Sequence, residues 1–175
     1  GIYDPELDAG AVRIFPAQIA QGSKVFGLGW RNAIGSEDFT DDGSAYVELH
    51  GGLSPTFDEP YTLAGGASVQ WEERWYPVHC IGNFVTANEY AALNLSRRAG
   101  GVRVALYAPV ALAGRVEVVT LDAAGGEQVA AAFPLELAPA EQVVSDLDEI
   151  APNAAVVIRV RDHSGTVLLE YASDH

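Results

Sequence analysis

The stretch that decides the fold is YVELHGGLSPTFDEPYTLAGGASVQWEERWYP, at residues 46–77. It begins with alternating polar and apolar residues, passes through Gly- and Pro-rich turns and ends in an aromatic run. Successive side chains of a β strand point to opposite faces, so Tyr46, Glu48 and His50 should share one face and the residues between them the other. One face can be buried while the other meets solvent or a ligand.

Similar alternating runs recur along the chain between Gly, Pro, Asp and Asn residues, and no segment keeps an apolar stripe at helical spacing for three turns. We therefore predict an all-β protein built from antiparallel sheets. In the first half the expected strands cover residues 11–15, 24–30, 46–51, 68–76, 84–88 and 91–97.

The composition changes at RRAGG, residues 97–101, where long aromatic runs give way to short Val- and Ala-rich runs separated by turn residues. That spacing, about 8–12 residues, is typical of a β-sandwich. We predict two domains, at residues 1–97 and 98–175, of which the second resembles Ig-like accessory modules. For residues 141–150 we expect either one helical turn, capped by Ser145 or Asp146, or a loop.

Charge and composition exclude some classes of partner. Ten Lys and Arg face 24 Asp and Glu, a formal net charge of −14, which repels nucleic acid and anionic membranes. A hydrophobic content of 49% is sufficient for a packed core. No apolar run approaches the roughly 18 residues of a membrane span, and the N-terminus lacks the pattern of a signal peptide. We expect a soluble chain whose cellular compartment the sequence does not indicate.

Cys80 is the only cysteine, so neither an intrachain disulfide nor a Cys-based metal site can form. Its apolar neighbours predict a buried, inert thiol. The adjacent His79 should point to the opposite strand face, which argues against a Cys/His pair. The other histidines and acids have no recognised metal-ligand spacing, so we expect neither a metal nor a cofactor.

The order YVEL (46–49), a Gly/Pro turn, YTLAGGASV (61–69) and WEERWYPV (71–78) resembles the C-terminal half of the galactose-mutarotase-like supersandwich, especially its branch with the domain called DUF5107. The resemblance spans residues 12–95 and implies a partial supersandwich for residues 1–97. Gly65 and Ala67 depart from the family, which usually has Pro and Glu there.

In sugar epimerases of that fold, a glutamate on the corresponding strand acts as the general base, and by resemblance Glu48 falls on this position. Those enzymes also use histidines that precede the glutamate, whereas this chain has none before His50. The resemblance thus implies a fragment or truncated relative that is not catalytic alone, with an aldose-epimerase-like or glycoside-processing parent as one expectation.

Glu48 is therefore the candidate catalytic residue, and Tyr46, His50, Trp30 and Arg31 are the candidate carbohydrate-binding residues. An aromatic ring and a planar guanidinium can stack on a sugar and donate hydrogen bonds to it. Each also has a purely structural interpretation: Glu48 as an exposed strand glutamate, His50 as a surface histidine and Trp30 as a core residue. A working base would further need a pKa near the operating pH.

Two functions follow from these observations. The first is a module that binds carbohydrate or accompanies carbohydrate processing, with a sugar as its ligand. The second is a non-catalytic structural or interaction module of a larger multidomain protein, packed against neighbouring domains. A truncated supersandwich should expose an apolar patch, which also predicts a homodimer.

Overall fold

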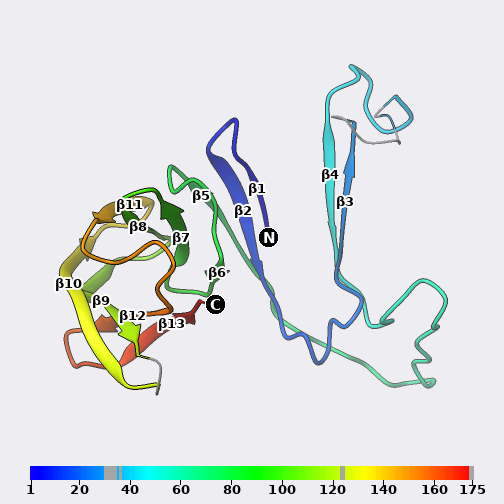
Figure 1. Ribbon diagram of the computed structural model, residues 1–175. Coiled ribbons are helices and arrows are strands. Elements are labelled where there is room, and N and C mark those ends of the chain that lie inside the picture. The colour runs from blue at the N-terminus through cyan, green and yellow to red at the C-terminus, as the bar shows by residue number, and fades with distance from the viewer. Residues whose placement is uncertain (30–34, 36, 123–124, 174–175) are drawn as a thin grey trace. The chain divides into compact units, whose positions relative to one another are not determined.

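The computed structural model describes residues 1–29, 35, 37–122 and 125–173 (Figure 1). Within these residues it contains strands β1 to β13 and no helix, and every strand pair is antiparallel. The all-β prediction is confirmed. Trp30 and Arg31, two of the candidate sugar-binding residues, lie outside the described residues.

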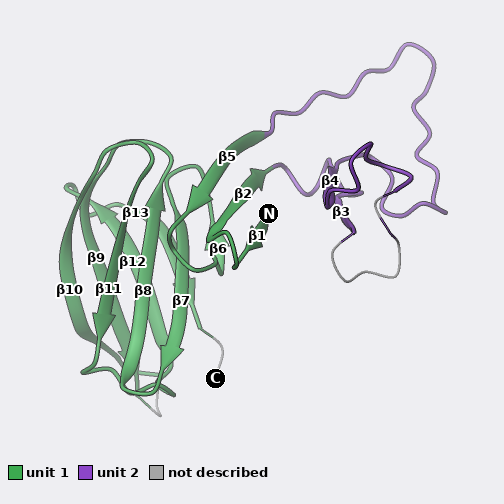
Figure 2. Ribbon diagram, turned by 90° about the horizontal axis from the view of Figure 1, so that it is seen from above, with its two compact units in different colours: residues 1–14, 74–175 green, residues 15–73 purple. Residues whose placement is uncertain are grey.

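The chain forms two compact units, coloured separately in Figure 2. Unit 1 comprises Gly1–Ile14 and Arg74–His175, and unit 2 comprises Phe15–Glu73. The domain boundary expected at residue 97 falls inside unit 1, in the hairpin between β7 (Ala92–Arg98) and β8 (Gly101–Ala108). Arg98 pairs with Gly101, so the glycines at this point mark a tight turn between neighbouring strands.

The main part of unit 1 is a β-sandwich. One sheet has the order β11-β8-β7-β6, with β6 at Thr86–Ala87 and β11 at Glu141–Leu147. The other has the order β10-β9-β12-β13, formed by Glu127–Leu137, Leu112–Leu121, Val156–Asp162 and Val167–Ala172. Both sheets belong to the green unit of Figure 2.

The sandwich core is built from every second side chain of each strand, because successive side chains point to opposite faces of the sheet. Val102, Val104 and Leu106 of β8 are at most 1% exposed and belong to the same core cluster as Ile158 and Val160 of β12. Complete burial of an aliphatic side chain contributes about 1.5–3 kcal/mol, so these alternating faces are the main stabilising feature of unit 1.

A third sheet, of order β1-β2-β5, covers part of the outer face of β8. Its strands are Ile2–Asp4, Ala9–Ile14 and Arg74–His79. Val12 and Val78 pack with Ala105 and Tyr107, the β8 residues that alternate with the sandwich core. β8 is therefore buried on both faces over its second half.

The prediction of a buried thiol is wrong, because Cys80 is exposed. β5 ends at His79, and Cys80 adopts a left-handed conformation with φ of 58°. Its backbone N–H donates a 2.8 Å hydrogen bond to the carbonyl of Asp8. This turn interrupts the strand alternation on which the prediction rested.

Several segments differ from the expected elements, and the strand expected at residues 84–88 covers only Thr86–Ala87. The strand expected at residues 68–76 begins only at Arg74. Residues 141–147 form neither a helical turn nor a loop but the strand β11, which pairs with β8 from Glu141↔Ala108 to Leu147↔Val102. The neighbouring β8 edge supplies backbone partners that the local sequence does not reveal.

Unit 2 contains a two-stranded ribbon of β3 (Lys24–Leu28) and β4 (Tyr46–His50), visible in Figure 1. The register pairs Lys24 with His50 and Leu28 with Tyr46. Residues 51–73 contain no strand.

The left-handed Ala140, with φ of 69°, generates a stability prediction. This conformation costs an L-residue roughly 1–2 kcal/mol, whereas glycine adopts it freely and loses about 0.5–1 kcal/mol in chain entropy. We expect Ala140→Gly to raise the free energy of unfolding by up to about 1 kcal/mol, measured by urea denaturation. Ala132→Gly, at an exposed β10 position without positive φ, is the matched control and should lower it. Equal losses in both variants would contradict the assignment of strain to Ala140.

A second prediction concerns the sandwich core. Leu106→Ala removes a fully buried side chain and should lower the free energy of unfolding by about 2–5 kcal/mol. Val144→Ala, in the neighbouring strand but 47% exposed, should cost less than about 1 kcal/mol. Comparable losses in the two variants under urea denaturation would show that this core does not control stability.

Candidate functional site

The candidate site is a row of three side chains on one face of β4. The Tyr46 hydroxyl donates a 2.9 Å hydrogen bond to Oε1 of Glu48, and Nε2 of His50 contacts Oε2 of the same carboxylate. The side chains of Glu48 and His50 are 30% and 47% exposed. The expected sharing of one face by these residues is therefore observed, and we call Tyr46, Glu48 and His50 the polar row.

An aromatic residue of β3, Phe26, lies beside this row. Phe26 is the register partner of Glu48, and its ring meets the His50 ring edge-on at 5.2 Å between centroids. The Phe57 ring lies 5.9 Å from that of Phe26, and Nζ of Lys24 lies 4.9 Å from the Phe57 centroid. The polar row is thus bordered by rings and one cation.

At the other end of the row, the ring of Phe39 stacks on that of Tyr46, with centroids 6.4 Å apart and planes 10° from parallel. Phe39 and Phe57 are both exposed. The row consequently combines hydrogen-bonding groups with accessible aromatic surface.

The electrostatics of the row favour an ionised carboxylate. The hydrogen bond from His50, followed by that from Tyr46, lowers the pKa of Glu48 below its ordinary value. The hydrogen bond to Glu48 is also the largest cause that raises the pKa of Tyr46. Because a base acts best with a pKa near the operating pH, the lowered pKa makes Glu48 a weak base and a good hydrogen-bond acceptor.

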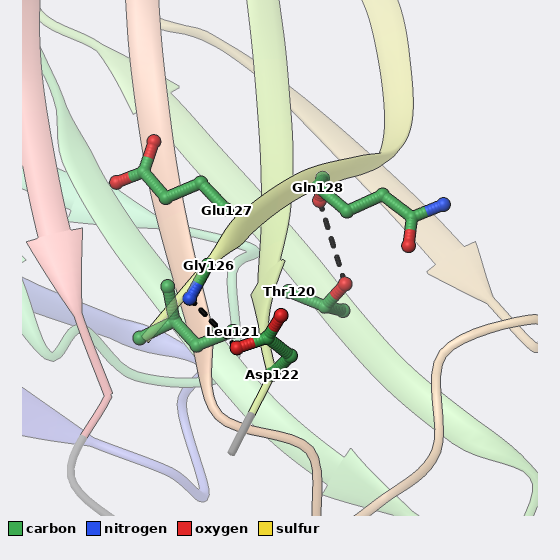
Figure 3. A pocket seen from close by; sticks show the side chains of 6 residues that line it. All are labelled: Thr120, Leu121, Asp122, Gly126, Glu127 and Gln128. Atoms are coloured by element: carbon green, nitrogen blue, oxygen red, sulfur yellow. Dashed lines mark hydrogen bonds between the residues drawn. The ribbon is translucent and has the colours of Figure 1, made fainter. Parts of the chain in front are cut away.

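Residues 46–50 also line an open, shallow hollow on the ribbon. Another hollow lies at the end of the β9–β10 hairpin (Figure 3), lined by Thr120, Leu121, Asp122, Gly126, Glu127 and Gln128. In this second hollow Asp122 accepts a 2.7 Å bond from the Gly126 N–H, and Glu127 pairs through both oxygens with Arg159. The polar row remains the stronger candidate, because it combines a carboxylate with exposed aromatic rings.

Among the described residues, no group of three or more His, Cys, Asp or Glu side chains is arranged to hold a metal ion. The described residues also contain no helix that is long and apolar enough to cross a membrane.

Sequence reasoning identified the three members of the polar row but missed Lys24, Phe26 and Phe57. Alternation in residues 24–28 does place Lys24 and Phe26 on one strand face. The β3–β4 register places that face beside Glu48. The sequence pattern of either strand alone does not predict this register.

Comparison with known proteins does not assign the chain to a family. No protein-family model matches it, and neither a curated protein nor a solved structure does. The resemblance to the mutarotase-like supersandwich therefore stays a prediction.

The polar row predicts a specific titration. By ¹³C-detected NMR, the Glu48 carboxyl should titrate below the ordinary glutamate value of about 4.3. His50→Ala should raise its pKa most, because it removes the largest cause, and Tyr46→Phe should raise it less. Replacement of the exposed turn histidine, His163→Ala, is the control and should leave it unchanged.

The sign of the accompanying stability change follows from linkage. A carboxyl with a lower pKa in the folded state stabilises the fold above its unfolded-state pKa, and loses that contribution as the pH falls through the folded-state value. A Glu48 pKa that is unaffected by His50→Ala would show that the row does not exist in solution.

Proposed function

We propose that this chain is a carbohydrate-binding β module that contacts its ligand through the polar row and does not catalyse a reaction alone. The observation that carries the proposal is the hydrogen-bonded sequence of phenol, carboxylate and imidazole on an accessible strand face, with Phe26 beside it. An ionised carboxylate accepts hydrogen bonds from sugar hydroxyls, and aromatic faces pack against the apolar face of a sugar ring.

Two observations argue against catalysis by the chain alone. The lowered pKa of Glu48 reduces its strength as a base, and the open hollow around it does not exclude water from a reaction. The resemblance to the mutarotase-like supersandwich, including its DUF5107 branch, supports sugar as the ligand class. The Ig-like character of residues 98–175 is likewise part of this proposal.

The proposal is tested by titrating the chain with a panel of mono- and oligosaccharides in a calorimeter. A ligand found in this way should bind Glu48→Gln about 10- to 100-fold more weakly, since a hydrogen bond to a charged group contributes roughly 1.5–3 kcal/mol. Glu136→Gln, at an exposed position of β10, provides a matched control that should bind like the unmodified chain. Binding that survives Glu48→Gln, or no binding by any sugar in the panel, would refute the assigned site.

A second function, that of an interaction module, is supported by the exposed apolar side chains of unit 2. Phe57 is 77% and Val25 is 53% exposed, and Phe39, Tyr61 and Leu63 are each about half exposed. Exposed apolar surface of this kind is typical of protein contacts. Light scattering at increasing concentration separates self-association, which would give the expected homodimer, from a contact with a different partner.

A further inference from the structure

Within the described part of unit 2, β4 is an edge strand of its ribbon. β3 and β4 form a two-stranded sheet, and across the residues that the structure describes no further strand pairs with β4. Isolated two-stranded ribbons are marginally stable in water, and an open edge presents backbone groups to which another strand can bind.

The register identifies which backbone groups face this edge. The Gly22 N–H donates a 3.0 Å hydrogen bond to the carbonyl of Gly52, in line with the register that pairs Lys24 with His50. Hydrogen-bonded and non-hydrogen-bonded pairs alternate along antiparallel strands. The backbone groups of Val47 and Leu49 therefore point away from β3, toward the open edge.

The two outer edges of the ribbon are not equivalent. By the same alternation, the backbone groups of Val25 and Gly27 point to the outer side of β3, and a glycine within a strand weakens pairing. The β4 edge instead presents Val47 and Leu49, which are β-branched or aliphatic and half-buried. We therefore consider the β4 edge the better acceptor of an added strand.

The charge of the surroundings limits what can bind. Residues 15–73 contain two basic residues, Lys24 and Arg31, and nine acidic ones, a formal charge of 2 − 9 = −7. The acidic residues are Glu37, Asp38, Asp41, Asp42, Glu48, Asp58, Glu59, Glu72 and Glu73. Two copies of unit 2 would each carry this negative charge and repel one another, whereas a basic segment would be attracted.

We propose that β4 binds an extended segment of a partner polypeptide in which basic residues alternate with apolar ones. Its backbone bonds to Val47 and Leu49, its basic side chains lie on the face of Glu48, and its apolar side chains lie on the opposite face. Strand addition of this kind derives affinity from backbone bonds and specificity from alternate side chains. The backbone bonds to Val47 and Leu49 do not require that the polar row binds a sugar.

The test uses a fluorescent, end-capped octapeptide of alternating valine and lysine, with binding followed by anisotropy. Val47→Pro removes an outward N–H and leaves the β3–β4 bonds in place, as proline is tolerated on an open edge. It should weaken binding at least about 10-fold, the effect of losing about 1.4 kcal/mol. Val25→Pro is the matched control on the other edge and should change binding less than about 2-fold.

Two changes to the probe test the mechanism without altering the protein. Methylation of alternate backbone nitrogens in the peptide should weaken binding at least about 10-fold, because it blocks strand pairing. Replacement of its lysines by glutamates should do the same through repulsion. Circular dichroism of both proline variants verifies that the fold is retained.

Several results would overturn the proposal. Equal binding by the unmodified chain and Val47→Pro, or by the methylated and unmethylated peptides, would mean that charge alone attracts the probe. Failure of the valine–lysine peptide to bind the unmodified chain would exclude the proposed partner. Dimerisation of the chain that Val47→Pro abolishes would show that a second copy occupies the edge.

Discussion

The burial of β8 on both faces is the constraint on which the rest of unit 1 depends. Val102, Val104 and Leu106 face the sandwich core, and Ala105 and Tyr107 face the sheet of β1, β2 and β5. A single strand therefore links three layers, and its alternation must satisfy two apolar environments at once. Ala105 and Tyr107 are buried on the outer side, where the Tyr76 ring stacks on the Tyr107 ring with centroids 6.3 Å apart.

The third sheet also determines where unit 2 leaves and rejoins the chain. β2 ends at Ile14 and β5 begins at Arg74, and these two residues are register partners. The intervening 15–73 segment is thus an insertion whose ends are held together by a strand pair.

Within this insertion the two proposals differ in their main chemical groups and share the face of Glu48. The polar row presents side chains, whose hydrogen bonds lower the basicity of Glu48 and leave an accepting carboxylate. The open edge presents the backbone of Val47 and Leu49, which alternate with the row and point away from β3. One strand can offer both kinds of group, because its side chains alternate between the two faces and its backbone N–H and C=O groups alternate between the two edges, whatever the residue types.

Local periodicity was sufficient to predict the all-β class and the shared face of Tyr46, Glu48 and His50, because side-chain direction repeats every two residues. Net charge likewise required only composition. The neighbours of the row, the strand β11 and the exposure of Cys80 were decided by tertiary structure. Each depends on pairing or on a backbone turn. The β3–β4 register brings Phe26 to Glu48, and the edge of β8 pairs with residues 141–147 to form β11. Cys80 lies in a turn whose backbone N–H bonds to the carbonyl of Asp8. Partners distant in sequence leave no periodic signal in either segment alone, so only the folded chain reveals them.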